Sequence, residues 1–219
     1  MTKQQKLVEI FNRIYNLNVC GPDPLKVKRD ISATNINSKV MVIAEAMAPE
    51  QVRLSGINYF YKDGTIGSTG KSLEKFLNKF DYTVYPSREN CIYHTEIVHN
   101  FPGHQIKSGR KSIKRPTKIE IEESIRSNIL TDEIDVIKPK LILLMGSTAY
   151  QTFNKYILKV DISNNLSKEI ERITKTGDYH MYKDIPIIPI QHSSGANPRF
   201  NTMLKNIELI QLIKKIINA

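Results

Sequence analysis

The 219-residue sequence predicts an α/β fold, a three-layer α/β/α sandwich with a central, mainly parallel four-stranded sheet. Short, nearly continuous apolar runs alternate along the chain with longer segments whose apolar residues recur at helical spacing. Apolar runs of this kind are typical of strands that helices cover on both faces. Neither an internal repeat nor a long linker interrupts the sequence, so we expect residues 1–219 to form one domain.

Four apolar runs are the expected strands: residues 40–44, 90–98, 141–145 and 185–190. The last of them contains Pro186 and Pro189, which remove backbone donors from a strand ladder. We therefore expect the fourth strand to lie at an edge of the sheet or to be short.

The expected helices are amphipathic and occupy the segments between the strands: residues 3–15, 71–80, 117–135, 147–158 and 202–217. Thr117 precedes a first turn with acidic residues, which the dipole of a helix favours at that end. The apolar stripes of these helices are expected to face the core.

In an open parallel sheet, ligands bind in the crevice beyond the carboxyl ends of the strands. Three polar segments punctuated by glycine or proline follow expected strands, at residues 44–49, 94–100 and 191–200. The sequence thus predicts one site formed by these three segments.

The charge of the chain indicates a polyanionic partner. Lysine and arginine total 32 against 22 acidic residues, a formal net charge of +10. Residues 107–118 contain six of these cations and no acid: Lys107, Arg110, Lys111, Lys114, Arg115 and Lys118. Contact with nucleic acid phosphates is the favoured interpretation, and a solvated loop is the alternative.

The sequence does not have the features of membrane-spanning, secreted or disulfide-rich proteins. No apolar run approaches the length of a membrane span, and the first residues lack the apolar core of a signal peptide. Two cysteines, Cys20 and Cys91, cannot form a disulfide framework. The expectation is a cytoplasmic protein with no membrane contact and no evident obligate protein partner.

Five segments, in order, resemble the motifs of the uracil-DNA glycosylase superfamily, and most of all its family four. They read V-I-A-E-A-M-A-P (42–49), G-S-T-G-K-S-L (67–73), T-E-I-V-H-N-F-P (95–102), P-K-L-I-L-L-M-G-S-T-A (139–149) and H-S-S (192–194). The correspondence covers about residues 17–200. The resemblance implies an enzyme that flips one base out of DNA and hydrolyses its N-glycosidic bond.

The resemblance implies two catalytic residues, and each fits the chemistry. Glu45 matches the glutamate of the first motif, and a carboxylate can stabilise an oxocarbenium-like sugar or orient water. Its alternative role is to cap the following turn, and Glu50 is the second candidate. His192 matches the histidine of the last motif and can donate a hydrogen bond to the departing base.

The segment after His192 is expected to press against the DNA duplex. Its candidate DNA contacts are Ser193, Ser194, Asn197 and Arg199. Arg199 would fill the base stack or hold a phosphate, and a surface arginine is the alternative. Further phosphate contacts are expected from Lys111, Lys114 and Arg115.

Family four holds an iron–sulfur cluster with four cysteines, and this chain departs from that pattern. Cys20 remains, but the other three positions read Leu17, Asn100 and Ser124. Because such a cluster needs thiolates, we expect no cluster, no metal and no other cofactor.

Glu96 stands where the family has the asparagine that pairs with uracil. A carboxylate would repel O4 of uracil but can accept from the amino group of cytosine and, if protonated, can donate to N3. The alternative is that Glu96 pairs with a nearby cation. The phenylalanine that stacks on the base in the family falls near Thr65, and Tyr59, Phe60 or Tyr61 can replace it.

The sequence therefore predicts a glycosylase for a C5-modified cytosine, otherwise for uracil, acting in repair or against modified phage DNA. One alternative is a non-catalytic DNA-binding or base-sensing module on the same fold. Another is a small-molecule enzyme on a flavodoxin-like sheet, although the sequence has neither a P-loop nor a G-x-G-x-x-G motif.

Overall fold

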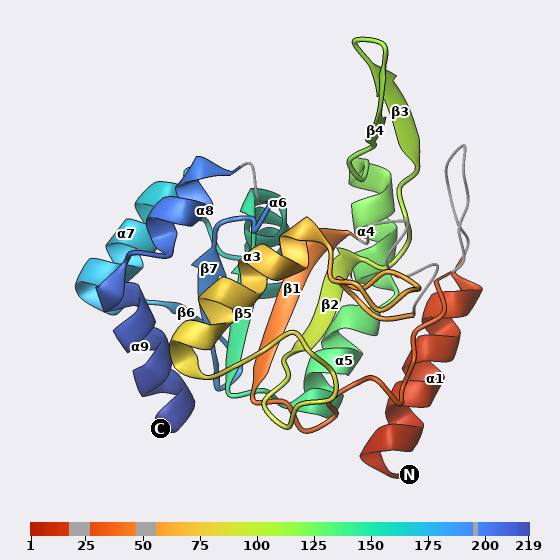
Figure 1. Ribbon diagram of the computed structural model, residues 1–219, viewed down its shortest axis with the longest axis horizontal. Helices are drawn as coiled ribbons and strands as arrows, with labels where there is room; N and C mark the ends of the chain where they lie inside the picture. Colours follow the sequence, from red (N-terminus) through yellow and green to blue (C-terminus); the bar gives the residue numbers. More distant parts are fainter. Residues whose placement is uncertain (18–26, 47–55, 195–196) are drawn as a thin grey trace.

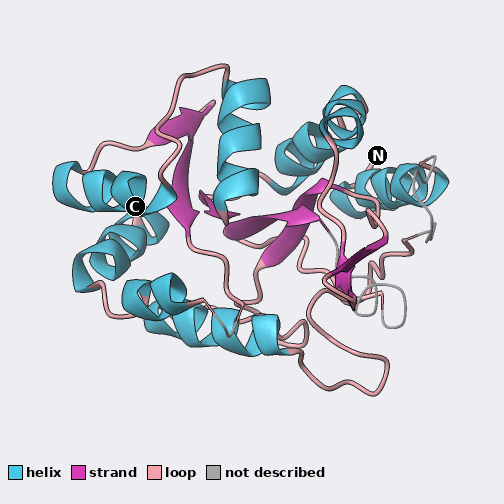
Figure 2. Ribbon diagram, turned by 90° about the horizontal axis from the view of Figure 1, so that it is seen from above, coloured by secondary structure: helices cyan, strands magenta, loops and turns pink. Residues whose placement is uncertain are grey.

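A five-stranded sheet with strand order β2-β1-β5-β7-β6 forms the centre of the computed structural model, which describes residues 1–17, 27–46, 56–194 and 197–219. The parallel strands are β1 (Val40–Ala46), β2 (Tyr93–Val98), β5 (Leu141–Met145) and β7 (Ile185–Ile190). Helices cover both faces of the sheet (Figures 1 and 2). The predicted three-layer α/β/α fold is confirmed, with one strand more than expected.

The additional strand, β6 (His180–Tyr182), pairs antiparallel with β7. Because β7 lies between β5 and β6, the expectation of an edge position for it was wrong. Pro186 lies opposite Met181 of β6, and Pro189 lies opposite Leu144 of β5. A proline lacks the N–H donor but keeps its carbonyl acceptor, so each of the two prolines removes at most one hydrogen bond from the ladders of β7.

The described helices comprise α1 (Lys3–Asn16), α3 (Ser68–Leu77) with the 3-10 turn η1 (Asn78–Phe80), α4 (Lys118–Arg126), α5 (Ile129–Ile137), α6 (Ser147–Thr152) with the π-helical η2 (Phe153–Leu158), α7 (Leu166–Thr176), α8 (Pro198–Met203) and α9 (Ile207–Asn218). Helix α7 was not expected. The segments 117–135 and 202–217 do not form single helices. Asn128 adopts a left-handed conformation with φ 58° between α4 and α5, a geometry that asparagine tolerates better than most residues.

The core lies on both faces of the sheet. All five residues of the central strand β5 are buried. Helices α4 and α5 pack on β2, α1 packs on α5, and α7 packs on β7. None of the helices in the described part of the chain is long and apolar enough to cross a membrane.

The basic segment forms a hairpin rather than an irregular loop. Strands β3 (His104–Lys107) and β4 (Arg110–Ile113) pair antiparallel around Ser108 and Gly109. Both turn residues have positive φ, 51° and 72°, as a two-residue turn matched to the twist of a hairpin requires. The hairpin projects away from the body of the molecule (Figure 1).

Candidate active site

A pocket of about 290 Å³ lies at the carboxyl ends of the parallel strands. Its polar lining includes Glu45 and Glu96 from β1 and β2, His94 of β2, Tyr59, and His192 after β7. Its remaining lining residues come from the strand ends, from the turn before Tyr59, from α3 and from the base of the hairpin: Ala44, Ala46, Asn58, Thr69, Pro102, Ile113, Lys114, Arg115, Pro116 and Met145. The structure thus brings Glu45, Glu96 and His192 around one cavity.

Buried polar atoms without hydrogen-bond partners gather at this pocket. In the described residues, eight buried side-chain nitrogen or oxygen atoms lack a partner, and five of them belong to residues that line the pocket. These five are Oε1 of Glu45, the hydroxyl of Tyr59, both ring nitrogens of His94 and Oε1 of Glu96. An unsatisfied buried group costs about 1–3 kcal/mol, so native proteins keep few of them without a reason. A polar ligand that pairs with these atoms would supply that reason.

Glu96 is fully buried, and Arg29 holds it as a carboxylate. The guanidinium of Arg29 forms a short ion pair with Oε2 of Glu96. Burial alone would raise the pKa of Glu96, but Arg29 and then His94 favour the charged form and hold that pKa down at about 2. The expectation of a nearby cation is therefore met by Arg29. Oε1 lies beside the pocket, 3.1 Å from Nδ1 of His94, and makes no aligned hydrogen bond within the described part of the chain.

Arg29 also binds a second buried carboxylate, that of Glu133 on α5. The two side chains lie 3.0 Å apart and are 5% and 0% exposed. The hydroxyl of Tyr93 donates to Glu133 over 2.6 Å, and the ring of His99 lies 3.0 Å from it. Burial opposes the charge on Glu133, but Arg29 and His99 lower its pKa. One guanidinium thus joins β2 to α5 beneath the pocket.

His94 and Tyr59 form one wall of the pocket. Their rings meet edge to face, with centroids 4.6 Å apart. Tyr59 has a positive φ of 70°, a conformation that is rare for a bulky residue and that recurs at functional sites. A Cβ on Gly70 of α3 would lie 2.6 Å from the Cβ of Tyr59, so only glycine lets Tyr59 pack this closely on the helix.

His192 lies at the rim of the pocket as a neutral hydrogen-bond donor. Although its side chain is exposed, the protein atoms around the ring disfavour the charged form, and Arg115 adds repulsion, so the pKa of His192 lies below its usual value. The backbone N–H of Ser194 donates to Nδ1 over 3.2 Å. In a neutral imidazole the proton then lies on Nε2, which can donate.

The backbone behind His192 is fixed by Gly146 at the end of β5. Gly146 has φ +90°, and its N–H donates to the carbonyl of Ile190 over 2.8 Å. A Cβ at this position would lie only 3.4 Å from the Cβ of His192. The backbone at the end of β5 therefore packs directly against the side chain of His192.

Glu45 is half-buried near the end of β1, with Oε1 buried and without a hydrogen bond in the described residues. Glu50, the second candidate, lies outside the described residues, as does the turn that Glu45 was alternatively expected to cap.

The segment after His192 divides into buried and exposed parts. Ser193 is fully buried, and its hydroxyl lies 3.2 Å from the sulfur of Met145, which places its side chain in the protein interior. Asn197 caps α8, accepting from the backbone N–H of Arg199 and donating to the carbonyl of His192. Arg199 is exposed and lines a groove between α7 and α8 rather than the pocket. Ser194 is half-buried beside His192.

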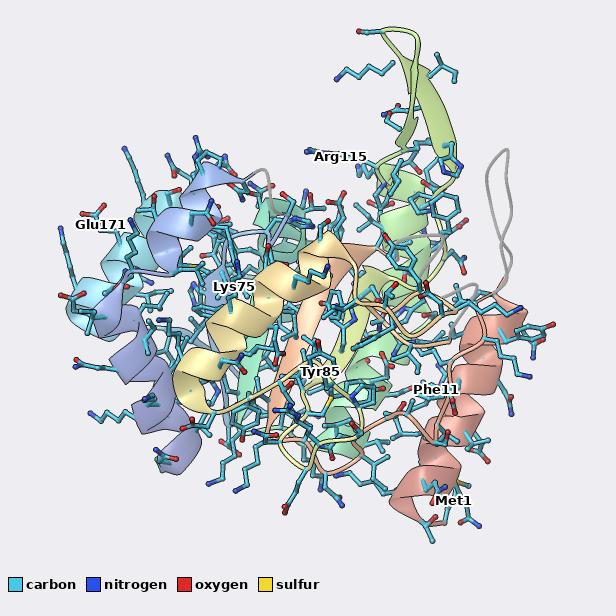
Figure 3. All side chains as sticks on the ribbon, viewed as in Figure 1. Met1, Phe11, Lys75, Tyr85, Arg115 and Glu171 are labelled. Carbon is cyan, nitrogen blue, oxygen red and sulfur yellow. The ribbon has the colours of Figure 1, made fainter. Side chains whose placement is uncertain are left out.

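The base of the hairpin borders the pocket. Lys114 and Arg115 line it directly, and the N–H of Lys114 donates to the carbonyl of Gly103 over 2.9 Å, which closes the hairpin at its base. Figure 3 shows Arg115 at this position, between the hairpin and the body of the molecule. The side chain of Lys111 lies outside what the structure describes.

Two candidate base contacts lie elsewhere. Phe60 is buried, with its ring edge to face against Tyr85 at 5.4 Å, and Thr65 is exposed and bonded to Asp63. Among the described residues, neither of the two lines the pocket. Tyr59 is the aromatic residue that does.

Leu17, Asn100 and Ser124, the positions that match cluster cysteines, line a separate cavity of about 300 Å³. The hydroxyl of Ser124 donates to the carbonyl of Ile97 over 2.7 Å. Cys20 lies outside the described residues. The three described positions offer no thiolate, so they do not fit an iron–sulfur cluster.

Sequence reasoning missed Arg29, Glu133 and His94. Arg29 stands in a segment without periodicity, 67 positions before Glu96. Glu133 had a usable signal, because it lies three residues after Leu130 and one before Ile134, on the apolar face of its helix. His94 also had one, because alternate residues of a strand share a face and Glu96 is two residues away.

A family model described as the uracil DNA glycosylase superfamily matches residues 31–213. No match was found among curated proteins. The crystal structure of wild-type Pedobacter heparinus SMUG2 is similar with a TM-score of 0.56 over 100% of both chains, at 12% sequence identity. That likeness shows a shared fold.

The ion pairs of Arg29 predict how stability depends on pH. The carboxylates of Glu96 and Glu133 have lowered pKa values in the folded protein, so their contribution is complete above the unfolded value near 4.5. It is lost as pH falls toward the folded value, about 2 for Glu96. Arg29→Met leaves two buried carboxylates without a cation and should lower the free energy of unfolding by about 3–5 kcal/mol at neutral pH.

In Arg29→Met the folded pKa values of both carboxylates should rise, so stability should fall as pH increases, the opposite of the wild-type trend. Urea unfolding across acidic and neutral pH measures this. Arg13→Met is the matched control, because Arg13 pairs with Asp132 at the surface, where both side chains are more than 40% exposed, and should matter much less. Equal effects of the two substitutions would contradict the prediction.

Proposed function

Because the chain belongs to the uracil DNA glycosylase superfamily, we propose that it is a monofunctional DNA glycosylase that hydrolyses the N-glycosidic bond of a flipped base and leaves an abasic site. The observation that carries the proposal is the pocket itself. It combines a neutral imidazole donor on His192 with polar atoms that have no hydrogen-bond partner among the described residues, including a carboxylate oxygen of Glu45. Extruding a base into such a pocket exposes its Watson–Crick edge to side chains.

In this mechanism Glu45 acts on the sugar. The breaking bond leaves positive charge on the deoxyribose, and a carboxylate nearby stabilises it or orients the attacking water. Oε1 of Glu45 has no competing hydrogen bond in the described residues, so it is available for either role.

His192 acts on the leaving base. Negative charge develops on the departing pyrimidine, and a positioned N–H near its O2 lowers the barrier. The hydrogen bond from Ser194 fixes Nδ1 as an acceptor, which leaves the proton on Nε2. Because the pKa of His192 is lowered, the neutral donor is the form present at neutral pH.

Glu96 favours cytosine-type bases. Its ion pair with Arg29 and its low pKa, about 2, favour the ionised form over the protonated form that would donate to N3. An ionised carboxylate accepts from the exocyclic amino group of cytosine but repels O4 of uracil. We propose a C5-substituted cytosine as the preferred base, with uracil as the alternative. Asn58 and Thr69, which line the same pocket, offer polar groups for the added substituent.

The basic hairpin is proposed to hold the DNA backbone beside the pocket. It adds Lys107, Arg110 and Lys111 to Lys114 and Arg115 at the rim, in a segment without acids. Phosphate contacts of this kind position DNA without reading its sequence. Removal of a modified base would serve either repair or attack on modified phage DNA.

The catalytic assignment predicts large losses of rate. Glu45→Gln and His192→Ala should each lower single-turnover base release by at least ~100-fold, because each removes a group that acts on the transition state. DNA affinity and melting temperature should remain close to wild type. Quenched-flow assays with alkali cleavage of abasic sites measure the rate.

The matched controls are Glu171→Gln on α7 and His180→Ala in β6, since neither residue lines the pocket. A near-normal rate of base release in Glu45→Gln or His192→Ala would show that the substituted residue is not catalytic. A wild-type protein that binds DNA but leaves no alkali-labile sites would identify a non-catalytic base-sensing module instead.

Neutralising the hairpin should weaken binding to every DNA sequence alike. Lys111, Lys114 and Arg115 changed to glutamine should flatten the dependence of log affinity on log salt by about one unit per lost phosphate contact. The control replaces Lys6, Lys214 and Lys215, which lie on α1 and α9 toward the chain ends, opposite the hairpin (Figure 1). An unchanged slope in the hairpin variant would mean that these cations do not contact phosphates and are ordinary solvent-exposed residues.

The substrate assignment predicts a switch at one residue. Wild-type protein should release a C5-modified cytosine faster than uracil, and Glu96→Asn should reduce that preference about tenfold to a hundredfold, because an amide fits uracil. Mass spectrometry of bases released from matched oligonucleotides measures both rates. Efficient release of uracil with none of any modified cytosine would refute the substrate while leaving the glycosylase activity in place.

A further inference from the structure

Glu96 alone cannot pair with the whole Watson–Crick edge of a cytosine-type base, because a hydrogen-bond donor is also needed. The Watson–Crick edge of cytosine presents an amino donor at N4 beside an acceptor at N3. Glu96 is held as a carboxylate by Arg29 and can only accept. A second group close to Oε1 of Glu96 must therefore face N3, or this base would bury an unpaired acceptor.

His94 is placed for this role by the strand itself. It lies two residues before Glu96 in β2, so both side chains are on the same face of the sheet. Nδ1 of His94 lies 3.1 Å from Oε1 of Glu96, and the His94 side chain is only 10% exposed. The two groups attract each other, which helps to lower the pKa of Glu96, but they are not aligned as a hydrogen bond, and neither ring nitrogen of His94 has an aligned partner among the described residues.

We propose that His94 and Glu96 form a base-reading pair, in which Oε1 of Glu96 accepts from the exocyclic amino group and a ring N–H of His94 donates to the adjacent ring nitrogen. This assignment rests on the proposed glycosylase function. It makes His94 a specificity-determining residue, because uracil presents a carbonyl and an N–H in the opposite order along the same edge.

Tyr59 is the competing donor, since its buried hydroxyl also has no hydrogen-bond partner in the part of the chain that the structure describes. Two features favour His94. It shares a strand with Glu96, which fixes their relative position, whereas Tyr59 belongs to a separate segment and packs against the His94 ring in a T-shaped contact. Tyr59 therefore orients the imidazole and is expected to affect all bases alike.

The test compares release of 5-hydroxymethylcytosine and of uracil from the same duplex under single-turnover conditions. His94→Leu removes both ring nitrogens and should lower the rate ratio of the two bases about tenfold to a hundredfold. His94→Gln keeps an amide N–H and should retain most of the preference. Tyr59→Phe should change both rates by a similar factor, and the control His180→Leu, in β6, should change neither.

A double variant distinguishes a direct contact of His94 with the base from a role of His94 in holding the pocket together. If the two residues act on one base edge, Glu96→Asn combined with His94→Leu should lower the ratio no further than Glu96→Asn alone. Melting temperatures of all variants identify any loss of fold, and His94→Gln keeps the test valid if His94→Leu is unstable.

Equal slowing of both bases by His94→Leu would overturn the base-reading pair and leave the glycosylase function intact. A loss of preference in Tyr59→Phe without one in His94→Leu would assign the donor to Tyr59 and overturn the pair as well. A wild-type protein that releases neither base would overturn both the pair and the proposed function.

Discussion

A single guanidinium balances two buried carboxylates at the centre of this protein. Arg29 reaches Glu96 on β2 and Glu133 on α5, and it lies 5.6 Å from the ring centre of Phe11 on α1. It also donates to the carbonyl of His94 over 3.2 Å. Breaking a buried pair of this kind leaves a charge without compensation, so the three elements and the floor of the pocket depend on the same cation.

This constraint also determines the chemistry of the site. Without Arg29, burial would push Glu96 toward its neutral form, and the pocket would present a donor instead of an acceptor. The acidic floor contrasts with the chain as a whole, which has a formal net charge of +10, and with Lys114 and Arg115, which line the pocket at the base of the hairpin. Such a charge distribution would attract phosphates to the rim and repel them from the floor, which fits the proposed entry of a base with the DNA backbone kept at the rim.

The sequence predicted those features that follow from local periodicity. The four parallel strands, the α/β/α layering and the position of the pocket all come from apolar runs followed by polar turns. Glu45 and His192 were proposed because they match motifs of the family that the chain resembles, and the structure brings both side chains to this pocket.

The remaining features depend on contacts between distant segments. Arg29 lies in a segment with no periodic pattern, and only the fold brings it to Glu133, 104 positions away. The break at Asn128 depends on one left-handed residue that composition does not single out. Phe60 was chosen as an aromatic near the expected site, but packing against Tyr85 turns it into the core and leaves Tyr59 at the pocket.

The central claim is that a flipped base binds with its amino group on Glu96. The most direct test is a crystal structure of the slow His192→Ala variant bound to a duplex that contains 5-hydroxymethylcytosine. The account predicts an extrahelical base in the pocket, with N4 within hydrogen-bond distance of Oε1 of Glu96 and the glycosidic bond beside Glu45. A base that remains stacked in the duplex, or one that enters with its amino group directed away from Glu96, would contradict it.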